Sequence, residues 1–223
     1  MPMNTTTHTP IARTAASLAL TLCALGAHAA VTTYTSSSSF LAATTTTNLA
    51  TFNDVAVGGY GQTLSTNGIN ITSLVGGSAQ HDVYVDQPST NNFAVANTTN
   101  VLDANGDENF KFKLVSGNTF SAIGFDFYAN LYGAPLFSFY DSSSVLMTSV
   151  SVAQTPSTLG FIGFTSTLPI AYITTTVDRG WQQNTGFDNL RIASTNAVPE
   201  PQAAWLLLAG LVAVAGVARR RSA

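Results

Sequence analysis

Phe110-Lys111-Phe112-Lys113-Leu114 is the stretch that indicates the fold most clearly, because large apolar residues alternate along it with lysines. Neighbouring side chains of a β-strand point to opposite faces. The alternation therefore places the phenylalanines on a buried face and both lysines on a wet face. It predicts a strand with one face in solvent, which is typical of antiparallel sheets.

The same period of two extends over the middle of the chain, and turn residues interrupt it roughly every 8 to 12 positions. We expect strands at residues 49–57, 69–74, 82–86, 93–96, 110–115, 120–128, 136–140, 145–152, 160–165, 170–177 and 187–192. No convincing amphipathic helix interrupts them, and glycine-rich or Asn-Gly segments punctuate the runs. The pattern predicts an all-β fold, with one antiparallel β-sandwich over residues 49–195.

The N-terminal segment, residues 1–29, has the features of a secretory signal peptide. Arg13 precedes the apolar run 14–27, and Ala27-His28-Ala29 supplies the small-x-small pattern that signal peptidase needs. Cleavage after Ala29 would leave Ala30 as the first residue. About 14 apolar residues are fewer than the ~20 of a membrane span. Residues 30–48 are expected to form a Ser/Thr-rich leader, and an exposed Thr-rich strand is the alternative.

Cysteine usage and charge narrow the classes of function. Cys23 is the only cysteine and lies in the predicted signal peptide, so the mature chain would have no disulfide and no thiolate site. Ten acidic residues face four basic ones between residues 30 and 198. A domain with this balance would be repelled by phosphates, so nucleic acid is not an expected partner.

The C-terminal segment has three parts in a fixed order. Val198-Pro199-Glu200-Pro201 breaks any preceding strand, an apolar stretch follows at 203–218, and Arg219, Arg220 and Arg221 come next. Sixteen helical residues span about 24 Å, somewhat less than a ~30 Å hydrocarbon core. The sequence predicts a short transmembrane helix with its arginines in the cytoplasm and the β domain on the periplasmic side.

This tail, residues 196–223, resembles the PEP-CTERM sorting signal of Gram-negative bacteria. The resemblance implies that an exosortase, a membrane cysteine protease, recognises Pro199-Glu200-Pro201. It also implies removal of the helix after transient anchoring in the inner membrane, transfer to the outer surface or the medium, and a link to exopolysaccharide or extracellular matrix. The middle is similar to a jelly-roll-like sandwich through residues 122–127, 161–164 and 186–192.

The sequence gives little support for catalysis in the domain. His81 would be the only histidine after signal removal, and no Gly-x-Ser-x-Gly motif occurs. Glu108 is the domain's only glutamate, and Asp82 and Asp86 would lie about 13 Å apart along a strand, too far for a glycosidase pair. We expect no enzyme. The alternative is a secreted hydrolase that acts on a glycan or another surface polymer.

Two candidate binding sites remain. Asp103, Asn105 and Asp107 alternate in a loop and could direct oxygens at Ca²⁺, although Glu108 stands where an EF-hand needs glycine, so a solvated turn is the alternative. No other cofactor is expected.

Tyr60, Tyr132 and Trp181 lie beside glycines and could present rings to a sugar, although aromatic residues of this kind also form cores. A calcium-dependent, ice- or surface-binding module is a weaker alternative, because Thr44 to Thr47 are contiguous and do not alternate on one face. We expect an exported, non-catalytic protein with a structural or binding role linked to exopolysaccharide or extracellular matrix.

Overall fold

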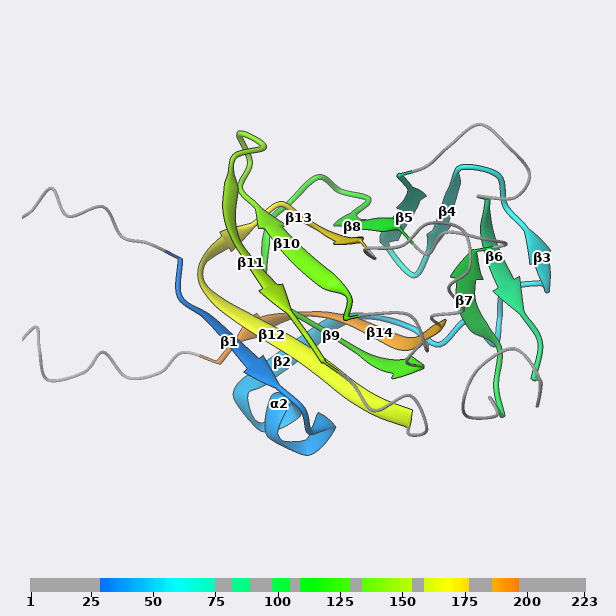
Figure 1. The fold of residues 1–223 in the computed structure, drawn as a ribbon, viewed down its shortest axis with the longest axis horizontal. Helices are drawn as coiled ribbons and strands as arrows, with labels where there is room; N and C mark the ends of the chain where they lie inside the picture. The colour runs from blue at the N-terminus through cyan, green and yellow to red at the C-terminus, as the bar shows by residue number, and fades with distance from the viewer. Residues whose placement is uncertain are drawn as a thin grey trace, which may run out of the picture.

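The computed structural model describes residues 29–74, 82–88, 98–104, 109–128, 134–153, 159–176 and 186–196. Within them, two antiparallel sheets form a sandwich (Figure 1). The eight-stranded sheet has the order β1 (Val31–Tyr34), β12 (Leu159–Ile170), β9 (Phe120–Tyr128), β14 (Gly186–Thr195), β7 (Val101–Ala104), β6 (Val83–Asp86) and β3 (Gly58–Gly59), with β2 (Thr44–Ala50) also paired to β14. The six-stranded sheet has the order β11 (Leu146–Ser151), β10 (Leu136–Tyr140), β13 (Tyr172–Thr176), β8 (Phe110–Leu114), β5 (Ile69–Ser73) and β4 (Thr63–Thr66). The predicted all-β sandwich is confirmed.

Phenylalanine side chains from both sheets form the core. Phe110 and Phe112 of β8 meet Phe187 of β14 with ring centroids 5.9 and 5.7 Å apart. Phe125 of β9 lies 5.6 Å from Phe137 of β10. These rings are fully buried. The two pairs with Phe187 are edge-to-face, an arrangement that adds to the stabilisation that burial supplies. Phe110 and Phe112 are therefore on the buried face of their strand, as the alternation at residues 110–114 predicts.

The last strand, β14, changes partner halfway along its length. Phe187 pairs with Leu102 of β7, whereas Leu190 to Thr195 pair with β2. Asn189 lies between them with φ of 49°, and the register with β9 shifts at the same place. Asparagine tolerates this left-handed backbone better than most residues, so a bulge forms here. The bulge lets one strand pair with two others along the same edge.

The prediction that residues 30–48 form a leader was wrong, and the alternative of a Thr-rich strand is partly correct. β1 pairs with β12, and β2 pairs with the end of β14. Between them, Ser37–Ala43 form the helix α2, which the sequence analysis did not predict. The polar composition hid these elements because only one face of each contacts the protein.

The helix α2 packs on the outer face of the eight-stranded sheet (Figure 1). Its Phe40 is fully buried and lies over Gly124 and Gly163, which are direct partners on β9 and β12. A Cβ atom on Gly163 would lie 2.5 Å from the Phe40 ring, so only glycine leaves room for it. Tyr34 and Phe161 complete this second cluster, with ring centroids 5.8 and 5.5 Å from Phe40.

Most other predicted strands agree with the structure to within a few residues. The strand predicted at 49–57 ends at Ala50 instead, and β3, β4 and β7 were missed. β4 and β5 join through Asn67-Gly68, whose φ angles of 48° and 77° suit a tight hairpin turn. The strand predicted at 93–96 lies outside the described residues.

Candidate functional site

The two ends of the described domain lie at the same end of the sandwich (Figure 1). At the N-terminal end, Thr167 N donates to Ala30 O and Ala30 N donates to Thr167 Oγ1, each at 3.1 Å. Ala30 and Asn196 line one open hollow of about 660 Å³, beside Tyr34 and the end of α2. Both segments predicted to be processed thus leave from one edge of the domain.

Asn196 is held by the helix α2 and by β2. Its backbone N–H donates to Ala43 O and its Nδ2 donates to Ala42 O, both at 3.0 Å. Thr45 Oγ1 donates to Asn196 Oδ1 at 2.7 Å. These three bonds hold the chain three residues before Pro199.

Most residues of the predicted sorting and cleavage sites lie outside the described residues. This applies to Ala27, Pro199, Glu200, Pro201, Arg219, Arg220 and Arg221, whereas Ala29 and Ala30 are described. No helix in the described residues is long and apolar enough to cross a membrane. The helix predicted at residues 203–218 lies outside the described residues.

Of the predicted calcium ligands, only Asp103 lies in the described residues; Asn105 and Asp107 do not. Asp103 belongs to β7, not to a loop, and is opposite Tyr84 of β6. Its Oδ1 is buried without a hydrogen-bond partner among the described residues. Burial, and secondarily the nearby Asp86 carboxylate, raise the pKa of Asp103 to about 8. In the described part of the chain, no three His, Cys, Asp or Glu side chains form a metal-binding group.

Tyr60, predicted as a sugar platform, is partly buried against the main core. Its hydroxyl donates to Ala56 O at 2.5 Å, and its N–H donates to Val83 O. The neighbouring glycines had suggested exposure, but these contacts hold the ring in place. Tyr132 and Trp181 lie outside the described residues.

A polar cluster that the sequence analysis missed surrounds the β14 bulge. Asp188 and Asp126 are cross-strand partners on the outer face of the sheet, and Asp188 is 3% exposed. Thr99 Oγ1 donates to Asp188 Oδ2 at 2.7 Å, and Asn189 Nδ2 donates to Asp126 Oδ2 at 2.7 Å. Burial is the main cause that raises the pKa of Asp188. Both carboxylates are used to hold the bulge, which is a structural role.

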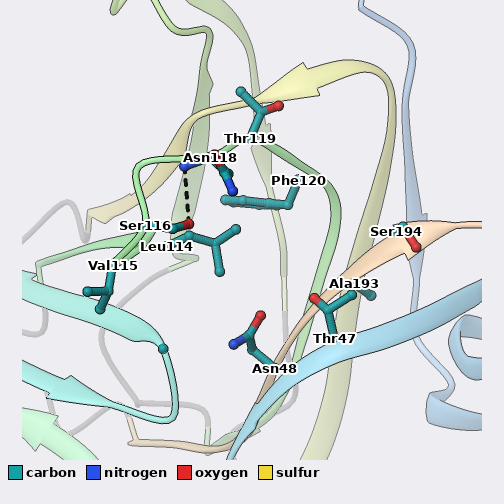
Figure 2. Close-up of a pocket in the computed structure, with 11 residues that line it drawn as sticks. Thr47, Asn48, Leu114, Val115, Ser116, Asn118, Thr119, Phe120, Ala193 and Ser194 are labelled. Atoms are coloured by element: carbon teal, nitrogen blue, oxygen red, sulfur yellow. Dashed lines mark hydrogen bonds between the residues drawn. The ribbon is translucent and has the colours of Figure 1, made fainter.

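An open hollow of about 360 Å³ lies where β2, the end of β14 and the β8–β9 loop meet (Figure 2). Hydroxyl, amide and apolar side chains line it, among them Thr47, Asn48, Asn118, Phe120 and Ser194, and none of the lining residues is charged. Asn118 N donates to Ser116 Oγ at 3.3 Å across the loop. The lining suits water or a neutral polar group.

The comparisons with known proteins give a match in the C-terminal tail. No curated protein matches the chain. The family model described as the PEP-CTERM protein-sorting motif matches residues 197–222, which begin directly after Asn196. The match covers Pro199-Glu200-Pro201, the apolar stretch and the three arginines. The chain therefore carries a PEP-CTERM sorting motif behind its β-sandwich, and is an exported protein sorted at the envelope.

Proposed function

We propose that this protein is a non-catalytic component of the outer surface or extracellular matrix, delivered by exosortase processing and associated with polysaccharide. The sorting motif at residues 197–222 is the observation that carries the proposal. A PEP-CTERM motif implies processing by an exosortase. In this proposal signal peptidase first cleaves after Ala29, and the apolar segment 203–218 holds the domain at the inner membrane until the second cut.

The ordered end of the domain supports this sequence of steps. Asn196 is bonded to α2 and β2, and three residues further on the motif begins at Pro199. Three extended residues span about 10 Å. An exosortase that recognises Pro199-Glu200-Pro201 would therefore work within about 10 Å of the folded domain, with Ala30 at the same edge.

The roles of the acidic residues favour structure over catalysis. The two aspartates that the fold brings together, Asp126 and Asp188, accept hydrogen bonds that shape the β14 bulge. Thr99 Oγ1 and Asn189 N donate to Asp188, and Asn189 Nδ2 donates to Asp126. Binding or a structural role is the function we propose for the domain.

The test compares the mass and location of the protein in its host with those of a variant in which Pro199, Glu200 and Pro201 are alanine. We expect a native product that starts at Ala30, lacks residues 203–221 and lies outside the inner membrane. The variant should keep the tail and stay in the inner membrane. Ser194→Ala is the matched control, because Ser194 is exposed and lies before the matched segment.

An intact tail on the native protein, retained in the inner membrane whatever the motif, would contradict the proposal. A second variant, with Arg219, Arg220 and Arg221 changed to glutamine, tests the orientation. It should reduce the fraction of chains with a periplasmic domain, because cytoplasmic arginines fix the direction of a short span.

A further inference from the structure

We propose that the outer face of the six-stranded sheet binds an acidic polysaccharide, whose chain runs across the strands over Lys111, Lys113, Tyr140 and Tyr172. The proposal rests on the proposed function, because it names the class of polymer that the displayed domain would contact. It uses the lysine face that the alternation at residues 110–114 creates, and it uses a tyrosine pair that the sequence analysis did not select.

The orientation of these four side chains follows from burial. Phe110 and Phe112 of β8 are fully buried in the core, so Lys111 and Lys113 point outward. Ile173 of β13 and Phe139 of β10 are also fully buried. Their neighbours Tyr172 and Tyr140 therefore lie on the same outer face as the lysines.

The strand register places the outward residues in two straight rows. The first row runs Tyr140, Tyr172, Lys113, Asn70 and Ser65, one residue from each of five adjacent strands. The second row, two residues along each strand, runs Ser149, Ser138, Thr174, Lys111, Thr72 and Thr63. Ser138 and Thr174 are covered by their neighbours, with 7% and 8% of their surface exposed, so Thr72 and Thr63 are the accessible residues beside Lys111. Strands are about 4.8 Å apart, so the first row extends over roughly 19 Å. That length suits a polymer better than a single small molecule.

The aromatic and cationic groups of this face are held in place before any ligand arrives. The rings of Tyr140 and Tyr172 stack with centroids 4.6 Å apart and planes at 14°. Lys111 Nζ lies 4.2 Å from the centroid of the Tyr172 ring, a cation–π contact. A charge and an aromatic surface that are already ordered lose less entropy when they bind.

The strand carboxylates and the lysines of the described domain lie on different sheets, and Arg191 is a cation on β14 of the carboxylate sheet. None of the strands of the six-stranded sheet contains Asp or Glu, and they carry both lysines of the chain. Asp86, Asp103, Asp126 and Asp188 lie on strands of the other sheet. An acidic polymer would therefore meet ammonium groups without facing a strand carboxylate, and carboxylate–ammonium attraction would align it.

The remaining members of the rows suit a sugar polymer. Asn70, Ser65, Thr72 and Thr63 offer amide and hydroxyl groups that donate and accept hydrogen bonds. Ser65 Oγ donates to Asn70 Oδ1 at 2.7 Å, and the hydroxyls of Thr63 and Thr72 are 3.3 Å apart. Each of these groups can also bond a sugar hydroxyl. Neutral polar groups around two cations distinguish this face from the dense basic patches that bind nucleic acid.

The test measures binding of the full chain, in a mild detergent, to alginate, a polyuronate. Dextran serves as a neutral polysaccharide and single-stranded DNA as a polyphosphate. We expect alginate binding that weakens with salt, and little binding to dextran. Lys111→Gln with Lys113→Gln should weaken alginate binding about tenfold, since each exposed ionic contact contributes a factor of roughly three. Lys111→Arg with Lys113→Arg is the charge-matched control and should retain it.

A gain of affinity separates this effect from a folding defect. Asn70→Lys adds a second cation to the first row beside Lys113, the third on this face, and should tighten alginate binding about threefold. Unchanged alginate binding in the glutamine variant would overturn the proposal, as would DNA binding as tight as alginate binding. Processing of the Lys111→Gln, Lys113→Gln variant in the host should remain normal. Failure of processing in the native chain would count against the proposed function and leave the binding result intact.

Discussion

The contact between Phe40 and the glycine pair beneath it gives a quantitative prediction about the stability of the domain. Phe40 is fully buried, and its ring lies where a side chain on Gly163 would have to be. We consider Phe40→Ala, Gly163→Ala and the double variant. The three free energies of unfolding should not be additive, because each substitution changes the space that the other needs.

The magnitudes follow from the geometry. Removing a buried phenylalanine costs about 3 to 5 kcal/mol, and we expect about 3 kcal/mol at this peripheral cluster. In Gly163→Ala the new Cβ would lie 2.5 Å from Phe40 Cδ2 and 2.9 Å from Phe161 Cε1, an overpacking that costs about 1 to 3 kcal/mol. With Phe40 absent, the shorter contact disappears and the methyl group fills part of the hole. The double variant should therefore be less destabilised than the sum by about 1 kcal/mol or more.

Urea unfolding of the full-length protein, followed by near-ultraviolet circular dichroism of the aromatic core, measures these values. Gly59→Ala is the matched control, because its Cβ would lie 3.7 Å from the nearest Tyr84 atom, an ordinary contact. It should change stability by less than about 0.5 kcal/mol. Additivity of the two substitutions within about 0.5 kcal/mol would refute the packing that we describe.

Two further predictions concern a buried acid and the exit of the chain. Asp103 has a pKa of about 8 in the folded state and an ordinary value of 3.8 in the unfolded state. Between these values the folded state keeps a proton that the unfolded state has lost, so the free energy of unfolding should fall as the pH rises from about 4 to about 8. This dependence amounts to at most about 1.4 kcal/mol per pH unit, and Asp103→Asn should remove it. Thermal unfolding of both proteins at pH values from 5 to 8 measures the effect, and identical pH profiles for the two proteins would contradict it. Asn196→Ala removes the side-chain bonds to Ala42 and Thr45 and should cost about 1 kcal/mol, with faster amide exchange at the end of β14. Unchanged exchange there would show that these bonds do not hold the chain end.

The alternation of apolar and polar residues predicts much of the fold. The strands at 120–128 and 136–140 agree with the structure residue for residue, because buried Phe and Ile alternate there with smaller or polar residues. The segment before residue 49 was misjudged, since its serines and threonines carry no hydrophobic signal. Phe40 is the one large apolar residue that buries α2, and the glycines that receive it lie more than 80 positions away along the chain.

Candidate site residues were harder to predict, because exposure depends on tertiary contacts. Tyr60 lies beside glycines but packs on the core, whereas Tyr172 sits in a strand of ordinary composition and belongs to the outer face. Asp103 was expected in a loop and lies in a buried strand. The alignment of Tyr140, Tyr172 and Lys113 in one row depends on strand pairing, which the spacing of residues along the sequence does not reveal.

Both lysines of the chain lie on the six-stranded sheet, whereas the other sheet carries Asp86 and Asp126 together with Arg191, so the lysine face is the more positive face of a chain whose net charge is negative. Near a negatively charged layer, such a domain would experience a torque that turns its lysine face toward the layer. The torque acts within a Debye length of about 8 to 10 Å at physiological salt, and it would vanish in concentrated salt. The same asymmetry would orient neighbouring copies alike, so a coat of these domains would present its acidic sheet to the surroundings.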